Sequence, residues 1–242
     1  MIQAAQFNAA APTYDQFATI QTQIGQALVN RIYLSTTINK SVLDYGCGTG
    51  SLTSQLKQHA TLIIGYDPAP EMIEHACQTY TTKKHTIHWT SALSVIQNYA
   101  PFSLIFSNAA LQWENDLQNT IHFLAKNCQN QLLFSAFGPQ TFQELASIWP
   151  TPIIATQFHP LPNYESIVSH YFQHVSASYH RTVHEYASLS KLLQTIKGTG
   201  AYIPAISGLL TPRQFKQLES DYLNQYGSIK ATYDYIIVDG RH

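Results

Sequence analysis

An apolar strand that runs directly into alternating glycines restricts the fold of this chain more than any other feature. Ser41–Tyr45 has the length and apolar character of a buried strand. The glycines that follow it are Gly46, Gly48 and Gly50. Glycine permits a tight turn and a close approach of the backbone to a ligand. A helix is expected from about Thr49 to Lys57, and its first N–H groups would face that ligand. The segment predicts a binding site at the carboxyl edge of a parallel sheet.

The residues around the glycines distinguish between the ligands that such a loop can bind. A dinucleotide fingerprint needs glycine or alanine where this chain has Ser51, and a Walker loop needs a lysine directly after Gly50. Neither condition is met. Asp67 ends the second expected strand, where a carboxylate can accept both hydroxyls of a ribose. Asp44 can help to hold a cationic aminoacyl group. These two acids favour a nucleoside with a cationic tail.

Short apolar segments alternate with helical patterns over residues 41–137. Further strands are expected at residues 61–66, 85–90, 102–106 and 131–137, with helices that begin at Pro70 and span Leu117–Ala125. Before residue 41 the chain reads as helix, because isoleucine or leucine recurs every four residues at positions 20, 24, 28 and 32. This alternation implies right-handed βαβ units and a parallel sheet.

The second part of the chain is less regular. The prolines within residues 149–163 predict an irregular insertion. The elements expected after it are a strand within residues 175–186, a helix over 188–196 that stops at glycines 198 and 200, a helix capped by Thr211 with Pro212 in its first turn, and a strand over 231–238. The fold class is therefore α/β, with a Rossmann-like, mostly parallel sheet of seven strands and helices on both faces. We expect one domain over residues 1–242.

Composition excludes several classes of protein. The net charge is −1, with 13 basic and 14 acidic residues, so nothing indicates nucleic-acid binding. The 3 cysteines are too few for a disulfide framework and fit a reducing compartment. We find neither a secretory leader nor a membrane span, which would need about 18 consecutive apolar residues. We expect a cytoplasmic monomer.

The histidines invite a metal-binding interpretation. If His180 and His184 lie on a strand, their Cα atoms are about 13 Å apart, which is too far for one zinc ion. His170 and His174 could share a helix face, but two ligands do not make a site. We therefore expect no metal.

The segment from Val42 to Gly138 resembles the class I S-adenosylmethionine (SAM)-dependent methyltransferases. Three other segments narrow the resemblance to the malonyl-[acyl-carrier protein] O-methyltransferases of biotin synthesis. They are Phe7–Tyr14, Phe106–Trp113 and Lys197–Ala201. The likeness covers nearly the whole chain, although trans-aconitate methyltransferases share a similar Asn-x-x-x-Gln-Trp stretch. It implies a helical lid over residues 1–40, a SAM-binding core over 41–138, and a substrate-side insertion with the last strands over 139–242.

The resemblance also implies roles for individual residues. The cofactor-binding set is Asp44, Gly46, Gly48, Gly50, Asp67, Pro68, Met72, Ser91, Ala92 and Asn108. Within it, Asp67 would bind the ribose and Met72 would pack near the adenine. Relatives often carry an acid near position 91 for the adenine amino group, so here a Ser91 hydroxyl or a backbone carbonyl would serve. The catalytic set is Tyr14, Asn108, Gln112 and Trp113, and Arg181 and Lys197 would bind the substrate.

The implied reaction esterifies the free carboxylate of a malonyl thioester, carried by acyl carrier protein or coenzyme A. A carboxylate has a reference pKa near ~4 and is already ionised at neutral pH, so no general base is needed. An acidic carrier protein would dock on basic residues, for which the candidates are Arg181, Lys191, Lys197, Arg213 and Lys216. Two alternatives stay open: a methyltransferase for a small free acid such as trans-aconitate or for a carbon nucleophile, and a SAM-binding protein without catalysis.

Overall fold

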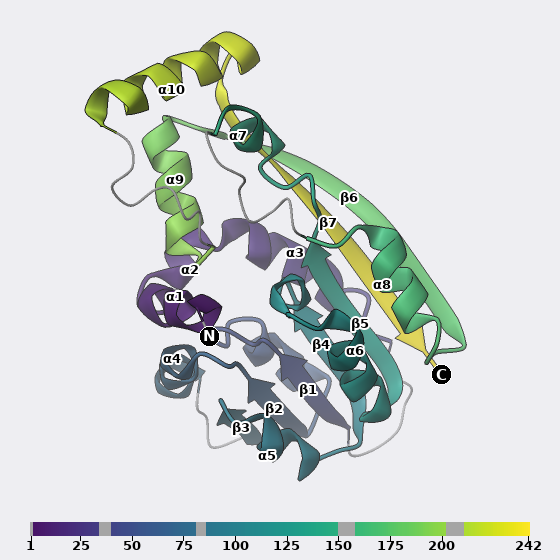
Figure 1. The fold of residues 1–242 in the computed structure, drawn as a ribbon. Coiled ribbons are helices and arrows are strands. Elements are labelled where there is room, and N and C mark those ends of the chain that lie inside the picture. Colours follow the sequence, from purple (N-terminus) through teal and green to yellow (C-terminus); the bar gives the residue numbers. More distant parts are fainter. Residues whose placement is uncertain (1, 34–39, 81–85, 150–157, 202–210) are drawn as a thin grey trace.

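The computed structural model describes residues 2–33, 40–80, 86–149, 158–201 and 211–242, and these build one sheet of seven strands (Figure 1). The strands are β1 (Ser41–Tyr45), β2 (Leu62–Tyr66), β3 (Thr86–Thr90), β4 (Phe102–Asn108), β5 (Cys128–Phe137), β6 (His174–Tyr186) and β7 (Ile229–Arg241). Their order across the sheet is β3-β2-β1-β4-β5-β7-β6. The strands β1 to β5 are parallel, and β7 runs antiparallel between β5 and β6. This confirms the expected seven-stranded, mostly parallel sheet.

The register of the central strands brings the predicted site residues to one edge. Asp44 on β1 lies opposite Gly65 on β2 and Phe106 on β4. Asp67 follows the last residue of β2, and Asn108 is the last residue of β4. Since parallel strands end at the same edge, these three polar side chains meet at the crevice where open sheets bind ligands.

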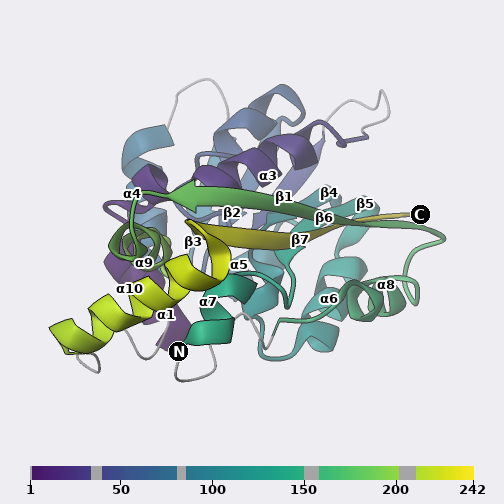
Figure 2. The same cartoon turned by 90° about the horizontal axis from the view of Figure 1, so that it is seen from above.

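Helices cover both faces of the sheet (Figure 2). On one face, apolar residues of α3 (Thr19–Val29) and the 3₁₀ helix η1 (Thr53–Gln58) pack against β1, β2, β4, β5 and β7. On the other, α5 (Leu93–Gln97), α6 (Leu117–Lys126) and α8 (Leu161–Val168) pack against the same strands. The strands are therefore buried on both sides, which explains their nearly continuous apolar sequences.

The N-terminal segment consists of three short helices rather than one. They are α1 (Ile2–Ala10), α2 (Tyr14–Phe17) and α3. The first lies near α4 (Pro70–Tyr80), where Ala11 buries itself against Ala69 and Met72. Ile32, expected on the helix, lies beyond its last residue. The segment thus covers the carboxyl edge of β1 and β2, and we call it the lid after the role that the resemblance implies for it.

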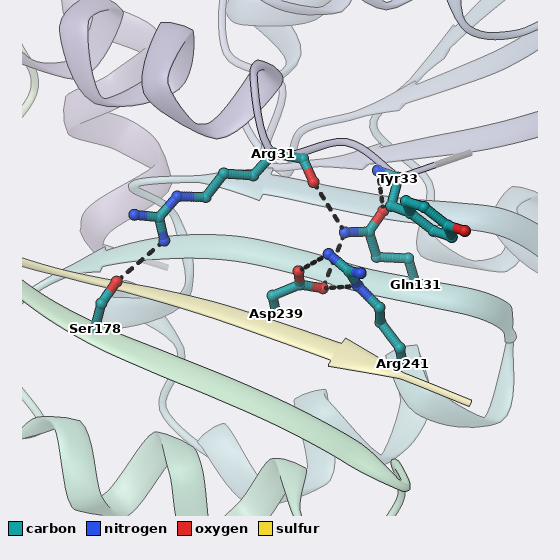
Figure 3. A network of polar contacts seen from close by, with 6 residues as sticks. All are labelled: Arg31, Tyr33, Gln131, Ser178, Asp239 and Arg241. Carbon is teal, nitrogen blue, oxygen red and sulfur yellow. Dashed lines mark hydrogen bonds and ion pairs between the residues drawn. The ribbon is translucent and has the colours of Figure 1, made fainter. Parts of the chain in front are cut away.

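A polar network fixes the end of α3 to the sheet (Figure 3). The Gln131 amide on β5 accepts a hydrogen bond from the Tyr33 N–H (2.9 Å) and donates to the Arg31 carbonyl (3.3 Å) and to Asp239 Oδ1 (2.9 Å). Asp239 also pairs with Arg241, while the Arg31 guanidinium donates to Ser178 on β6 (3.0 Å). Because Gln131 is only 1% exposed, these bonds form in a largely dry environment and hold α3 in place.

The C-terminal half forms a second apolar cluster. It combines α7 (Gln143–Ile148), α9 (Leu189–Gly198) and α10 (Pro212–Tyr226) with the start of β7 and with Ile20 and Ile24 of α3. The capping box of Thr211 and Gln214 begins α10, which confirms the expected cap and the placement of Pro212. Within the described ranges, no helix is long and apolar enough to cross a membrane.

Two further expectations about secondary structure are wrong. The helix from Thr49 to Lys57 is reduced to η1, because the loop turns through residue 52 and the Thr53 hydroxyl donates to Asp44 (2.5 Å). The insertion over 149–163 is not irregular throughout, because Pro160 caps α8 and Pro162 lies in its first turn, where proline is tolerated. Residues 150–157 of that insertion, and His85 of the third expected strand, lie outside the described residues.

Candidate functional site

The glycine loop forms a tight turn that is fastened to β2. The N–H groups of Gly46 and Cys47 both donate to the carbonyl of Tyr66, at 2.7 and 2.9 Å. Gly46, Gly48 and Gly50 have φ values of 76°, 55° and 85°. These values lie in the left-handed region, which other residues adopt only at a cost. The local sequence therefore determines the shape of the loop.

Two of the three glycines have different surroundings. A Cβ added to Gly48 would meet no heavy atom within 4 Å, so it would project into open space beside the loop. A Cβ added to Gly50 would lie 2.6 Å from the Trp89 ring and 3.0 Å from Ala76. Gly48 therefore keeps space free for a ligand, whereas Gly50 permits close packing between the loop and the elements beneath it.

Asp67 is held by the backbone of the loop and of the turn that follows it. Its Oδ2 accepts from the Gly48 N–H and its Oδ1 from the Ala69 N–H, both at 2.9 Å. The side chain is 9% exposed, and burial raises the pKa of the Asp67 carboxyl to about 6 although both N–H groups lower it. Each oxygen retains a lone pair that can accept a further hydrogen bond.

Asp44 is the second buried acid of the site. It is 2% exposed, and its only described hydrogen-bond donor is the Thr53 hydroxyl. Burial raises the pKa of the Asp44 carboxyl to about 7, and the nearby Asp67 raises it further against the effect of Thr53. Two buried acids without a cationic partner among the described residues favour a ligand that brings positive charge and hydrogen-bond donors.

The largest cavity, here called the main cavity, lies between the lid and the carboxyl ends of β1, β2 and β4. Its volume is about 1110 Å³, above the roughly 300–1,000 Å³ of typical ligand pockets. Its walls include Tyr14, Gly46, Gly48, Asp67, Pro68, Met72, Asn108, Gln112 and Trp113. The buried Oε1 of Gln6, on α1, has no hydrogen-bond partner within the described part of the chain and also belongs to this wall.

A smaller space of about 50 Å³, the loop cavity, lies between the glycine loop and the lid. Asp44, Gly46, Gly48, Tyr14 and Asn108 contribute to its walls. Asn108 donates from Nδ2 to the carbonyl of Gln21 (2.9 Å) and accepts from the Ser135 hydroxyl at Oδ1 (2.8 Å). Asn108 therefore joins the lid to β4 and β5 at the point where the cavities meet.

A third space of about 30 Å³, the aromatic cavity, lies on the side of α9. Its lining is rich in aromatic rings: Phe7, Tyr14, Phe17, Trp113, Phe137, Phe142, Phe158 and Tyr233. The Trp113 ring stands edge-on to Phe7 (5.8 Å between centroids) and to Phe158 (5.0 Å), and thereby connects the lid to the C-terminal half. Of the residues that the structure describes, no lysine, arginine or histidine lines this cavity.

Tyr14 is the one expected catalytic residue that lines all three cavities. Burial raises the pKa of the Tyr14 phenol, and the carboxylates of Asp67 and Asp15 raise it further. The phenol therefore remains a hydrogen-bond donor at neutral pH. Gln112, another of the expected catalytic residues, supports the turn after β4. Its Nε2 donates to the carbonyl of Ala109 (2.6 Å), a residue with φ of 51°.

Some residues that we expected at the site line none of these cavities. They are Gly50, Ser91, Ala92, Arg181 and Lys197. Ser91 and Ala92 are exposed after β3. Arg181 lies on the exposed face of β6 and bonds Tyr179 (2.8 Å) and Gln140, and Lys197 lies on the exposed face of α9. Arg181 and Lys197 are exposed because of where β6 and α9 lie in the packed chain, and no local sequence pattern indicates this.

Other residues of the site were missed. Glu114 lines the main cavity and accepts from the hydroxyls of Tyr45 (2.9 Å) and Thr120 (3.1 Å). Gln21 lines both smaller cavities, and Asp15 accepts from the Thr49 hydroxyl of the glycine loop (2.6 Å). The sequence offered two signals for these residues: Glu114 directly follows the Gln-Trp pair, and Asp15 directly follows Tyr14.

The structure brings together no cluster of three or more metal-binding side chains among residues 2–33, 40–80, 86–149, 158–201 and 211–242. His180, considered above, instead lies near Ser178 (2.8 Å) and Arg31 (3.4 Å). The main and loop cavities together fit the SAM expected from the sequence. Asp67 and the orphaned Gln6 Oε1 are acceptors for hydroxyl or amino donors, Asp44 suits a cation, and Gly48 leaves the space that a bound nucleoside would fill.

Comparisons with known proteins agree with this geometry. Residues 42–130 match the family model described as a methyltransferase domain. A malonyl-[acyl-carrier protein] O-methyltransferase from Anoxybacillus flavithermus is 33% identical over 249 residues, covering 96% of this chain and 94% of that protein. The YcgJ protein of Bacillus subtilis has a similar fold, with a TM-score of 0.61 at 14% identity, covering 91% of this chain and 97% of that one. Magnesium protoporphyrin IX methyltransferase from Synechocystis, solved with bound SAH (S-adenosylhomocysteine), has a TM-score of 0.55 at 15% identity, covering 92% and 83%.

Proposed function

Because the chain belongs to the family of malonyl-[acyl-carrier protein] O-methyltransferases, we propose that it transfers the methyl group of SAM to the free carboxylate of a malonyl thioester. The observation that carries this proposal is a relative of that name that is 33% identical and spans 96% of the chain. The malonyl group is carried by acyl carrier protein, and the ester serves the synthesis of biotin, as the resemblance in the sequence implies.

The cofactor lies across the main and loop cavities. Asp67 accepts the two ribose hydroxyls at the lone pairs that Gly48 and Ala69 leave unused. Asp44 faces the ammonium group in the loop cavity, where a positive charge stabilises its ionised form. Pro68 and Met72 supply apolar wall for the adenine, and Gly46 and Gly48 give the backbone its close approach.

The acceptor enters the aromatic cavity, which adjoins the main cavity at Tyr14 and Trp113. Two polar side chains there, Tyr14 and Gln21, have no hydrogen-bond partner of their own among the described residues. They are neutral donors that can orient a carboxylate without forming an ion pair. In this assignment, Tyr14 and Gln21 take the role that the sequence suggested for Arg181 and Lys197.

The chemistry requires little of the protein beyond orientation. When bound, SAM would supply a methyl group on a sulfonium, which a carboxylate oxygen would take with release of a neutral thioether. The residues of this chain align the two reactants and exclude water through the aromatic rings around the acceptor. Orientation of this kind can lower a barrier by up to about 7–11 kcal/mol. Asn108 and Gln112 keep the turn after β4 in shape and act as positioning residues.

The carrier protein docks beside the aromatic cavity. Thr195 and Ile196 of α9 and Thr199, which directly follows it, line that cavity, while Lys191 and Lys197 lie on the exposed face of the same helix. Arg213 and Lys216 add positive charge at the start of α10. Complementary charge favours encounter with an acidic partner. Four of the five docking candidates therefore belong to the proposed docking surface on α9 and α10. The fifth, Arg181, lies on β6 and is not part of it.

The test is a transfer assay with purified protein and SAM labelled in its methyl group. Malonyl-acyl carrier protein, malonyl-coenzyme A and trans-aconitate are offered separately, and base-labile label is measured in each product. We expect label in a malonyl ester, and most on the carrier protein. Label in no malonyl ester would contradict the proposal, label in trans-aconitate alone would assign a small-acid methyltransferase, and tight SAM binding without any transfer would indicate a non-catalytic protein.

A matched variant checks the acceptor assignment. Tyr14→Phe keeps the aromatic ring and removes the hydroxyl, so kcat with the malonyl substrate should fall roughly 10-fold or more, the value of one hydrogen bond to a charged group. The Kd for the cofactor should change little. The equivalent change at a distance, Tyr99→Phe, is the control for loss of a phenol. An unchanged kcat in Tyr14→Phe would remove Tyr14 from this role.

A further inference from the structure

Glu114 presents an acid to the main cavity that none of the assignments above uses. Its Oε1 accepts from the Tyr45 hydroxyl (2.9 Å) and its Oε2 from the Thr120 hydroxyl (3.1 Å), and all three residues line the cavity. No lysine or arginine lines that cavity in the described part of the chain. The two hydroxyls therefore fix the orientation of a carboxylate that faces a ligand site without a cationic partner.

Glu114 lies in the same half of the site as Asp67. The rings of Tyr45 and Tyr66 are tilted against each other with 5.1 Å between centroids, and both line the cavity. Burial raises the pKa of the Tyr66 phenol to about 12, with the carboxylates of Glu114 and Asp67 as the next causes. Burial also raises the pKa of the Tyr45 phenol, followed by the charge of Glu114 and the hydrogen bond to it, and then by Tyr66 and Asp67. Both carboxylates must therefore lie close to this tyrosine pair.

The donors of the proposed cofactor can be matched to the acids of the site. SAM carries three groups of hydrogen-bond donors: the ammonium group, the ribose hydroxyls and the 6-amino group of adenine. Four acids line these cavities: Asp15 and Asp44 lie in the loop cavity, and Asp67 and Glu114 lie in the main cavity. Asp15 and Asp44 share the side of the site assigned to the ammonium group, and Asp15 accepts from the Thr49 hydroxyl. Gln6 adds one neutral acceptor from the lid. With the ammonium at Asp44 and the ribose at Asp67, the adenine amino group is left for Glu114.

The location of the adenine wall supports this match. Pro68, Met72 and Leu93 line the main cavity together with Glu114, and they provide apolar surface on which a purine can lie. Ser91 and Ala92, which the sequence suggested for the amino group, are exposed and line none of the three cavities. Each Glu114 oxygen accepts one hydroxyl and has a further lone pair for an N–H donor.

We propose that Glu114 accepts a hydrogen bond from the 6-amino group of the adenine and so selects an adenine nucleoside, the role expected of Ser91. Tyr45 and Thr120 act as positioning residues that hold this carboxylate. The inference rests on the proposed cofactor and is independent of the methyl acceptor. It would therefore survive a failure of the malonyl assay.

The test compares two ligands that differ at position 6 of the purine and in the hydrogen on the adjacent N1. SAH carries an amino group there, and S-inosylhomocysteine carries a carbonyl oxygen, which would face the carboxylate of Glu114 acceptor to acceptor. Isothermal titration calorimetry of the wild-type protein should show SAH binding roughly 10- to 150-fold more tightly, the range for a hydrogen bond to a charged group. In Glu114→Gln, whose amide can donate to the carbonyl, the ratio of the two Kd values should fall close to one.

Two variants serve as controls. Glu165→Gln makes the same chemical change at an exposed position of α8, and Ser91→Ala removes the hydroxyl suggested by the sequence. Both should keep the wild-type ratio. The proposal is overturned if Glu114→Gln keeps that ratio, or if Ser91→Ala abolishes it. Equal affinity of the wild-type protein for the two ligands would also overturn it, and that measurement needs no variant to fold.

Discussion

Replacing Asp44 with asparagine is expected to stabilise the ligand-free protein at pH 8 while it weakens cofactor binding. Burial, with the nearby Asp67, raises the pKa of the Asp44 carboxyl from 3.8 to about 7. Each unit corresponds to about 1.4 kcal/mol, so the ionised carboxylate lowers the free energy of unfolding by about 4 kcal/mol relative to the protonated form. Asparagine is isosteric, is always neutral, and still offers an oxygen to the Thr53 hydroxyl.

The sign of the pH dependence follows from the raised pKa. Below about pH 4 the carboxyl is protonated in both the folded and the unfolded state, and its contribution to stability is fully present. As the pH rises through about 7, that contribution is lost, because the folded state must then ionise a buried group. The advantage of Asp44→Asn should therefore be about 4 kcal/mol at pH 8 and less than half of that at pH 5.

The assay is urea denaturation of the cofactor-free protein at both pH values, followed by circular dichroism. In a thermal melt at pH 8, a gain of about 4 kcal/mol in the free energy of unfolding corresponds to a rise of Tm of roughly 8–16 °C for a chain of this size. The control, Asp221→Asn, removes the same charge from the exposed side of α10 and should change stability by less than about 0.5 kcal/mol. A variant no more stable than wild type at pH 8, or equally stabilised at both pH values, would refute the reasoning.

Three further outcomes are expected. Cofactor binding should release protons at pH 6 to 7, because Asp44 ionises beside the ammonium group and its pKa is raised to about 7 in the cofactor-free protein. Calorimetry in buffers of different ionisation enthalpy measures this release, and no release in this range would contradict the assignment. Asp67→Ala should weaken SAH binding roughly 10- to 150-fold by calorimetry, and an unchanged Kd would exclude Asp67 from the ribose site. Gly48→Val should abolish SAH binding in a protein that still folds, because its side chain would enter the open space of the main cavity. Gly50→Ala should mainly lower Tm, because its Cβ would lie 2.6 Å from Trp89. The reverse pattern would refute the division of roles between these two glycines.

The features that could be predicted from the sequence are those that depend on neighbouring residues and on strand order. The glycine loop and Asp67 follow strands that their short apolar sequences identify. Parallel pairing of these strands then places Asp44, Asp67 and Asn108 at one edge of the sheet. The same reasoning failed for the helix after Gly50. There a tertiary contact, the bond from the Thr53 hydroxyl to the buried Asp44, outweighs local propensity.

The aromatic cavity, which is the proposed acceptor side of the site, could not be predicted in the same way. The aromatic cavity combines Phe7 and Tyr14 with Phe158 and Ile196, residues that are distant in the sequence and that only the packed chain brings together. A charged residue such as Arg181 suggested a role because carboxylates pair with cations, but its exposure depends on β6 being the edge strand. Glu114 was missed because its partner Tyr45 lies on another strand end, 69 positions away.

The absence of lysine and arginine from the walls that the structure describes has a consequence for turnover. Under the proposed reaction, the positive charge that the acceptor carboxylate meets is the sulfonium of the cofactor, because the ammonium group lies beside Asp44. Methyl transfer removes both charges in a single step, leaving a neutral ester beside a neutral thioether. The attraction that assembles the reactants thus ends with the reaction itself. A fixed arginine in the wall would have gone on attracting every small acid of the cell. A neutral wall would leave recognition to the carrier protein of the proposed substrate.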